Sequence, residues 1–288
     1  MKIRSAWKRI AWIAASMLGA VLGLALIVGL REARADPIVR RARIALSGWP
    51  AGARPLRVAL VSDIHLGNRA MDAERLDRVI AQVNRARPDL VLLAGDFVVG
   101  HSPAGASDRA AGLTLPMARL KAPLGIVAVL GNHDHWTAPE AVRSALRKAG
   151  VTILENEAVR RGPLVLVGIG DAFSGHDRIA RALSAAHAWN GPRVVLTHSP
   201  DVAPRLPPGW PLVLAGHTHC GQIVLPFLGA LASRSPRADW KRLYDPRYRC
   251  GPVRDPGRLV IVTGGVGSGT IPIRLGAPPD WWLLELGP

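Results

Sequence analysis

Eight short apolar runs after residue 55 restrict what this chain can fold into more than any other feature. They are 56–62 (LRVALVS), 90–95 (LVLLAG), 125–131 (GIVAVLG), 164–170 (LVLVGIG), 194–198 (VVLTH), 212–216 (LVLAG), 259–265 (LVIVTGG) and 281–286 (WWLLEL). Continuous runs of this length are typical of strands that are buried on both faces of a sheet. Helical patterns separate several of them, at 72–87, 139–149 and 178–189. The sequence therefore predicts an α/β protein with a largely buried sheet system.

Polar residues stand at the ends of five of these runs, where open α/β sheets place their ligand sites. They are Asp63 and His65, then Asp96, then Asn132, His133 and Asp134, then His198, and finally His217 and His219. Spacing of two residues on an extended segment directs both side chains of a pair to the same face. Carboxylate and imidazole ligands without a thiolate suit divalent ions such as Mn, Fe or Zn. We therefore expect one metal-binding cluster.

These motifs resemble those of the calcineurin-like metallophosphoesterase superfamily. Its five blocks, D-x-H, G-D, G-N-H-[DE], a lone H and G-H-x-H, occur here in that order between residues 63 and 219. More narrowly, the chain resembles the membrane-associated bacterial phosphodiesterase branch through SDIHLG, GDFV, GNHD, THSPD, GHTHCGQ and VTGGVGSGTIPIRLGAPPDWWLLEL. The second block lacks the Asp and Arg of the protein phosphatase pattern G-D-x-x-D-R-G, so protein phosphatase activity is not expected.

The resemblance implies a fold and a mechanism. The implied fold is a four-layer α-β-β-α sandwich of two packed mixed sheets, and the implied cofactors are two divalent metal ions. By the same resemblance one ion is held by Asp63, His65 and His219, the other by Asn132, His198 and His217, and Asp96 bridges them. The resemblance further implies a metal-bridging hydroxide as nucleophile on phosphodiester or pyrophosphate bonds. His133 is then the group that stabilises or protonates the leaving oxygen, while Asp134 either orients His133 or caps the next helix.

The stretch from Ile10 to Leu30 contains no charged residue and is long enough, as a helix, to cover about 30 Å of hydrocarbon. It predicts a single-pass anchor in a bacterial inner membrane. A cleaved signal peptide is the alternative, since Ala33-Arg34-Ala35 forms an A-x-A pattern. We expect an anchor segment at 1–35, a linker at 36–54 and a catalytic domain at 55–288. Basic residues flank both ends of the stretch, and we favour a catalytic domain outside the cytoplasm.

The chain is strongly basic, with 37 Lys+Arg against 21 Asp+Glu and a net charge of +16. Such a balance suggests an anionic partner, either nucleic acid or a membrane surface. Single-stranded nucleic acid requires aromatic side chains interleaved with Arg on one face, but the chain has only three Phe and two Tyr and its nine Trp are scattered, so no nucleic acid is expected. A non-catalytic membrane or nucleic-acid-binding protein is the alternative, but the ligand set of the resemblance is complete.

Several features leave the substrate and the surroundings of the site open. Enzymes of the superfamily cleave UDP-2,3-diacylglucosamine, so a lipid-linked nucleotide is the first candidate, with other envelope phosphodiesters as the alternative for an external domain. The apolar segment 223–231 either packs on the body or forms a wall for an acyl chain. Cys220 and Cys250 are either free or paired, and pairing requires an oxidising compartment. Residues 220–257 predict an extended flap, residues 264–269 a glycine-rich turn near the metals, and the protein is expected to be a monomer.

Overall fold

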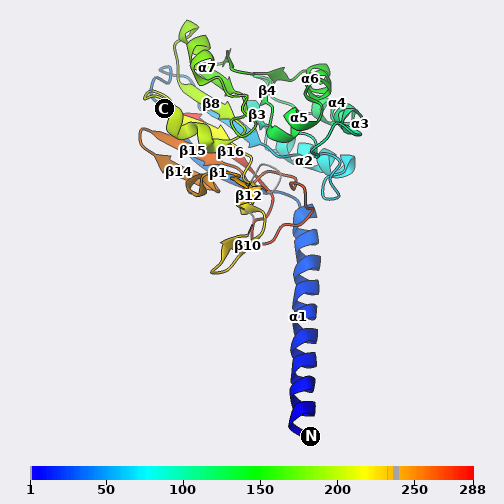
Figure 1. Ribbon diagram of the computed structural model, residues 1–288. Helices are drawn as coiled ribbons and strands as arrows, with labels where there is room; N and C mark the ends of the chain where they lie inside the picture. The colour runs from blue at the N-terminus through cyan, green and yellow to red at the C-terminus, as the bar shows by residue number, and fades with distance from the viewer. Residues whose placement is uncertain (1, 232, 236–239) are drawn as a thin grey trace.

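A computed structural model describes residues 2–231, 233–235 and 240–288. One long helix, α1 (Lys2–Arg34), leads into an α/β body (Figure 1). Along its exposed stretch, α1 is long and apolar enough to cross a membrane, from Ile10 to Arg34. The body contains two six-stranded sheets, and each of the eight apolar runs forms one of their strands.

The first sheet has the order β1-β16-β2-β3-β4-β5. Its strands are β1 (Ile38–Ala45), β2 (Leu56–Val61), β3 (Leu90–Ala94), β4 (Ile126–Val129), β5 (Thr152–Ile153) and β16 (Asp280–Gly287). The pair β16 and β2 is antiparallel and the other pairs are parallel, so the sheet is mixed. Strands β2, β3 and β4 therefore end at the same edge of the sheet.

The second sheet has the order β14-β15-β9-β8-β7-β6 and is also mixed. Its strands are β6 (Glu157–Arg161), β7 (Leu164–Ile169), β8 (Arg193–Thr197), β9 (Leu212–Ala215), β14 (Gly251–Asp255) and β15 (Arg258–Val262). After β9 the chain forms two small hairpins, β10 (Val224–Leu225) with β11 (Gly229–Ala230) and β12 (Arg234–Ser235) with β13 (Lys241–Arg242). These hairpins occupy the segment for which the sequence predicts a flap.

Three apolar cores hold the layers together. The central core lies between the sheets and includes Leu60 and Leu92 from the first sheet and Leu166 and Leu214 from the second. Outer cores lie under α2 (Ala73–Arg85), α4 (Thr114–Ala118) and α6 (Pro139–Lys148) on one side and under α7 (Ile179–Ala185) on the other. The helices α3 (Ala106–Ala111) and α5 (Asn132–Thr137) and the short 3-10 turns Ala186–Ala188, Pro200–Arg205, His219–Gly221 and Pro246–Tyr248 complete the body. The α-β-β-α prediction is confirmed.

The predicted linker 36–54 is wrong for its first half. Residues 38–45 form strand β1, which pairs in parallel with the whole length of β16 at the edge of the first sheet. The segment IVRRARIA carries basic side chains on an edge strand, where one face is exposed, and Arg40 forms an ion pair with the buried Asp280 at 2.5 Å. Without β1, strand β16 would present an unpaired edge. Pairing with that edge gives the segment between helix and body a regular structure. The domain boundaries themselves remain a prediction.

Candidate metal centre

All seven predicted ligands lie at the carboxyl ends of strands from both sheets and are buried. The first sheet supplies Asp63 and His65 after β2, Asp96 after β3 and Asn132 after β4, and the second supplies His198 after β8 and His217 and His219 after β9. Their donor atoms form overlapping groups suited to a metal ion. The structure thus brings together at one place residues that are up to 156 positions apart in the chain, from 63 to 219.

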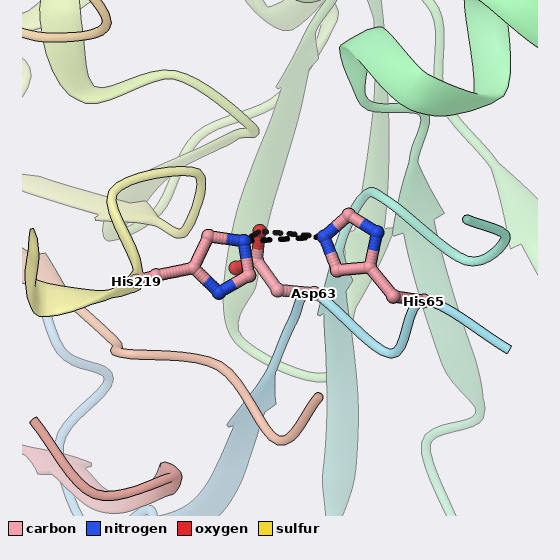
Figure 2. Close-up of side chains that lie close together, drawn as sticks. All are labelled: Asp63, His65 and His219. Atoms are coloured by element: carbon pink, nitrogen blue, oxygen red, sulfur yellow. Dashed lines mark hydrogen bonds and ion pairs between the residues drawn. The ribbon is translucent and has the colours of Figure 1, made fainter. Parts of the chain in front are cut away.

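The first half of the cluster contains Asp63, His65 and His219, whose side chains point toward one another in Figure 2. The two imidazole Nε2 atoms of His65 and His219 are 3.1 Å apart, and Asp63 Oδ1 lies 3.4 Å from that of His219. Asp63 Oδ1 is buried without a hydrogen-bond partner. A buried carboxylate oxygen without a partner costs free energy unless a cation neutralises it, so this half fits a metal ion.

The second half contains Asp96, Asn132, His198 and His217. His198 Nε2 lies 3.3 Å from Asp96 Oδ2, 3.1 Å from Asn132 Oδ1 and 3.2 Å from His217 Nδ1. Asp96 Oδ2 is also 3.5 Å from His65 Nε2, so its carboxylate touches both halves. A position that contacts both halves is the one expected of a bridging ligand.

Hydrogen bonds behind the imidazoles determine which nitrogen can bind a metal. His198 Nδ1 is 2.7 Å from the carbonyl oxygen of Ala94, and His217 Nε2 is 2.7 Å from that of Leu243. Because a carbonyl oxygen only accepts, each of these nitrogens carries the proton in a neutral ring. The opposite nitrogen of each ring then faces the cluster with a free lone pair, which is the arrangement found behind metal-binding histidines.

The backbone of the cluster is strained. Five of the seven ligands have a left-handed conformation, with φ of 53° at Asp63, 50° at His65, 56° at Asp96, 71° at His217 and 49° at His219. Such a conformation costs about 1–3 kcal/mol for a residue other than glycine and persists where the surrounding structure enforces it. A Cβ atom at Gly265 would lie 2.5 Å from that of Asp63, so the predicted glycine-rich turn does lie beside the metal cluster.

The electrostatics of the cluster are those of a site for cations. Burial raises the pKa of Asp63 to about 7, and the neighbouring Asp96 adds to the effect. Burial lowers the pKa of both His65 and His219 well below the usual value, which keeps both rings neutral, with one nitrogen of each free to bind a metal. Burial opposes ionisation of Asp96 as well, but His198 outweighs it and the pKa of Asp96 lies well below its usual range. Burial lowers the pKa of His198 too, but the Asp96 carboxylate outweighs it and raises that pKa well above the usual value, so a divalent ion would have to displace the proton of this ring. The neutral rings of His65 and His219 are already in the ligand state that such an ion requires.

The two residues predicted to be catalytic occupy different places. His133 lines the cavity in front of the cluster, and its Nδ1 is 2.6 Å from the carbonyl oxygen of Gly100, which leaves Nε2 on the other side of the ring. The carboxylate of Asp134 accepts hydrogen bonds from the backbone N–H groups of Gly131 and of residues 96–98. Asp134 therefore caps the start of its own helix, α5, and not that of the next helix, and the same carboxylate holds the loop that carries Asp96.

A cavity of about 510 Å³ opens in front of the cluster. At its inner end lie Asp96, Asn132, His133, His217 and His219. Its outer walls are largely aromatic and aliphatic and include Trp136, Phe173, Ile223, Tyr244 and Ile271. These wall residues come from five separate segments. Ile223 belongs to the apolar segment 223–231 and Ile271 to the C-terminal motif of the resemblance, whereas Trp136, Phe173 and Tyr244 lie in no motif that the sequence could have offered.

Sequence reasoning also missed Arg274, which is completely buried behind the cluster. Its guanidinium donates to the carbonyl oxygens of Gly264, Gly267 and Ala277 and lies 3.0 Å from His219 Nδ1. The guanidinium therefore holds the glycine-rich turn against the ligand loop. One arginine in a chain with 37 Lys+Arg gives no such signal in the sequence.

The two cysteines form a disulfide between Cys220 and Cys250, with their Cα atoms 4.7 Å apart. Cys220 directly follows the ligand His219, and Cys250 precedes strand β14 of the second sheet. Of the two alternatives that the sequence leaves open, the structure has the paired form. The bond attaches the loop with the last two ligands to the edge of the sheet.

A four-layer sandwich with such a donor cluster at its strand ends defines the class of metal-dependent phosphoesterases. The chain belongs to the calcineurin-like phosphoesterase family, whose sequence model matches residues 56–221. The family resemblance read from the motifs is thus confirmed, and the family implies divalent metal ions.

Among curated relatives, the chain is 32% identical to the phosphodiesterase YaeI of Escherichia coli, over 84% of this chain and 86% of that protein. It is 29% identical to an uncharacterized metallophosphoesterase of Helicobacter pylori over 90% of this chain, and 30% identical to a zebrafish transmembrane protein with a metallophosphoesterase domain over 86%. It spans 66% and 57% of the length of the latter two relatives.

Proposed function

We propose that this chain is a membrane-anchored phosphodiesterase with a dinuclear metal centre. The observation that carries the proposal is the convergence of seven buried donors from both sheets, with Asp96 in contact with both halves of the cluster. The similarity to the E. coli phosphodiesterase favours diester bonds over other phosphoesters. The complete ligand set argues against the alternative of a non-catalytic membrane or nucleic-acid-binding protein.

Each side chain has a place in this mechanism. Asp63, His65 and His219 would hold one divalent ion, Asn132, His198 and His217 the other, and Asp96 would contact both. Two such ions lower the pKa of a water between them and neutralise charge on the phosphoryl oxygens. The carbonyl oxygens behind His198 and His217 keep both rings in the required tautomer.

His133 is proposed to protonate the leaving oxygen. The carbonyl oxygen of Gly100 accepts a hydrogen bond from Nδ1–H, so Nε2 is the atom that faces the cavity, and it donates a proton when the ring is in the imidazolium form. The backbone N–H of His133 donates to Asp96 Oδ1 at 2.8 Å, which fixes the residue beside the cluster. Asp134 acts indirectly, because it holds the backbone of residues 96–98 and Gly131 in place.

The walls of the cavity support a substrate with an apolar part. Phosphoryl oxygens would lie at the polar inner end, and Phe173, Ile223 and Ile271 would contact an acyl or other apolar group. UDP-2,3-diacylglucosamine has this division and is the candidate for a domain in the cytoplasm, where UDP-sugars are found. Other envelope phosphodiesters share the division and are the candidates for a domain outside the cytoplasm. The apolar helix α1 would keep the enzyme beside such substrates.

We further propose that α1 is retained as a single-pass anchor of a bacterial inner membrane, with the catalytic domain on the extracytoplasmic side. The disulfide between Cys220 and Cys250 supports this side, because disulfides persist in oxidising compartments and are rare in the cytosol. The domain division into 1–35, the connecting segment and 55–288, and a monomeric state, belong to the same proposal.

The full chain in detergent, assayed with Mn, Fe or Zn, tests the proposed activity. We expect hydrolysis of bis-p-nitrophenyl phosphate to exceed that of p-nitrophenyl phosphate and to require two metal equivalents per chain by elemental analysis. UDP-2,3-diacylglucosamine and phospholipids then distinguish the substrate classes. Preparations that bind no transition ion, or that hydrolyse no phosphoester with any of the three ions, would contradict the proposal.

The role of His133 is tested by the leaving group. We expect His133→Gln to lower hydrolysis of a diester with an alkyl leaving group by about 100-fold, the lower end of general acid catalysis. The loss should be smaller with p-nitrophenolate, which needs little protonation. The matched control is His187→Gln, an exposed histidine in the 3-10 turn Ala186–Ala188. Equal losses with both leaving groups would exclude proton donation by His133.

A further inference from the structure

Helix α1 is fixed to the body at its C-terminal end. The carbonyl oxygen of Gly29 accepts a hydrogen bond from the backbone N–H of Arg274 at 3.0 Å, and Gly29 is buried. A Cβ atom at Gly29 would lie 2.5 Å from the side chain of Ile273, so glycine permits this close contact. Ala33, one turn later, is completely buried. The helix therefore meets the body through packing and not through a flexible joint.

Arg75 fixes the same junction from the other side. This completely buried arginine of α2 donates to the carbonyl oxygens of Arg34 at 3.1 Å and of Ala35 at 2.7 Å. The carbonyl groups at the end of a helix lack partners within it, and a cation there is also favoured by the helix dipole. Cleavage after Ala35 would break this cap. With α1 held at both contacts, the orientation of the helix relative to the body is fixed. This also fixes which face of the body lies on the side from which the helix projects.

The hairpin formed by β10 and β11 is built on the segment that holds α1. The backbone N–H of Val224 donates to the carbonyl oxygen of Leu275 at 2.8 Å, and that of Leu275 donates to Gln222 at 2.9 Å. Leu275 directly follows Ile273 and Arg274, the residues that touch Gly29. The hairpin accordingly projects from the body on the same side as α1 (Figure 1).

The tip of this hairpin is apolar and exposed to solvent. Residues 226–228 connect the two strands, and Phe227 is fully exposed while Leu228 is 73% exposed. Leu231, which follows β11, is 55% exposed. Adjacent large apolar side chains that are exposed to solvent mark an interaction site more often than a random feature of the surface. Phe227, Leu228 and Leu231 carry no charge, and contact with hydrocarbon requires uncharged side chains.

Basic and aromatic side chains follow this tip in the chain. Arg234 and Arg242 pair in register at the second hairpin, and both are exposed, as is Trp240 before β13. Arginine is attracted to anionic lipid headgroups, and tryptophan is enriched at the boundary between headgroups and hydrocarbon. Along the chain, the apolar tip is thus followed by basic and aromatic side chains. Apolar side chains suit the hydrocarbon layer of a membrane, and basic and aromatic ones suit the headgroup layer.

From these observations we infer that the tip at residues 226–228 inserts into the same bilayer that α1 spans. The metal cavity, whose wall includes Gln222 and Ile223 at the root of the hairpin, then opens at the membrane surface. The phosphoester of a lipid that remains in the bilayer can enter the cavity while its acyl chains stay beside the hairpin. Insertion of the tip does not depend on the proposed phosphodiesterase activity, whereas the inference of a lipid substrate rests on that activity.

Insertion is tested with the full chain in nanodiscs that contain an anionic phospholipid. A nitroxide spin label on Phe227→Cys should be accessible to oxygen, which concentrates in lipid, and protected from a water-soluble nickel chelate. The control is Leu115→Cys on α4, a residue that is 73% exposed on the body and should show the opposite pattern. Accessibility to the nickel chelate at position 227 would overturn the inference, and so would dipolar coupling between labels, which indicates contact with a second copy.

Kinetics test the consequence for the substrate. We expect the double variant Phe227→Ser, Leu228→Ser to lower the ratio of lipid diester hydrolysis in vesicles to bis-p-nitrophenyl phosphate hydrolysis by about tenfold or more, because two apolar side chains lose their burial in lipid. Leu115→Ser should leave this ratio unchanged. An unchanged ratio in the double variant would overturn presentation of a lipid. If the unaltered chain hydrolyses neither substrate, the proposed activity fails, while the label still decides whether the hairpin inserts.

Discussion

The cluster of candidate metal ligands and the tip of the β10–β11 hairpin both invert the usual distribution of side chains, in which charged groups are exposed and apolar groups are buried. At the cluster, carboxylates and imidazoles are buried, and Asp63 Oδ1 has no hydrogen-bond partner. At the tip, Phe227 and Leu228 are exposed although neither has a polar group. Burial of unpaired charge and exposure of clustered apolar surface are both unfavourable in water.

Both regions become favourable with a partner that lies outside the polypeptide. Divalent cations would neutralise the converging donors of the cluster, and a bilayer would cover the tip. The two regions are also adjacent, because Ile223 at the root of the hairpin lines the cavity above the cluster. A buried polar group and an exposed apolar group on one chain thus indicate two different partners, and each can be removed separately.

The largest expected effect is at the residue common to both halves of the cluster. We expect Asp96→Asn to lower phosphodiesterase activity by about 1,000-fold, because it removes a charge that contacts both proposed metal positions. The bound metal should fall from two equivalents to one or none. Asp108→Asn, which removes an exposed carboxylate on α3, is the control. Full activity with two bound ions in the Asp96 variant would refute its bridging position.

The next largest effect concerns the disulfide between Cys220 and Cys250, which closes the loop that contains the tip. Cys220 and Cys250 are 30 residues apart, and closing such a loop stabilises a fold by about 3–4 kcal/mol. The double variant Cys220→Ser, Cys250→Ser should lose that free energy of unfolding in denaturant titrations. Dithiothreitol should cause the same loss in the unaltered chain and none in the double variant. Equal stability of all these forms would show that the bond is absent in solution.

Addition of metal should stabilise the folded chain, and it should do so much more when the ligand cluster is intact. At a free concentration of 100 times its dissociation constant, an ion that binds only the folded chain adds about 2.7 kcal/mol. We expect Mn or Zn to raise the denaturation midpoint of the unaltered chain and to raise that of Asp96→Asn much less. A chelator should reverse the gain. Similar shifts in both proteins would locate the binding ion outside this cluster.

The smallest effect is expected at the tip, where a matched pair of substitutions gives the sharpest contrast. Phe227→Ala should change the free energy of unfolding in detergent by less than about 0.5 kcal/mol, because the side chain is exposed. Phe97→Ala removes the same side chain from the core and should cost about 3–5 kcal/mol. A large loss at position 227 would mean that the tip packs against the body.

The strands and the ligands could be predicted because both depend on local patterns. Continuous apolar runs indicate buried strands, and all eight appear in the two sheets. Asp63, Asp96, Asn132 and His198 each follow a strand, and their residue types in this order are specific to the family. The glycine-rich turn at 264–269 was predicted near the metals, and Gly265 lies against Asp63.

Other features could not be predicted because they depend on contacts between distant residues. Strand β1 was interpreted as a linker, since its alternating basic residues gain their meaning only beside β16. Arg75 and Arg274 cannot be distinguished from other arginines until the structure buries them against carbonyl oxygens from Arg34 or Gly264. The sequence left the pairing of Cys220 open for the same reason.

The sequence by itself determined the class of fold, the family and the set of candidate metal ligands. These follow from patterns within a few residues, because strand formation and ligand chemistry are local properties. The tertiary structure alone decided how α1 is attached to the body and which face of the body lies on the side from which α1 projects. Those properties arise where Gly29 meets Ile273 and where Arg75 caps the helix, contacts between segments that fold together only through packing. They place the exposed tip beside the anchor and the cavity beside the tip.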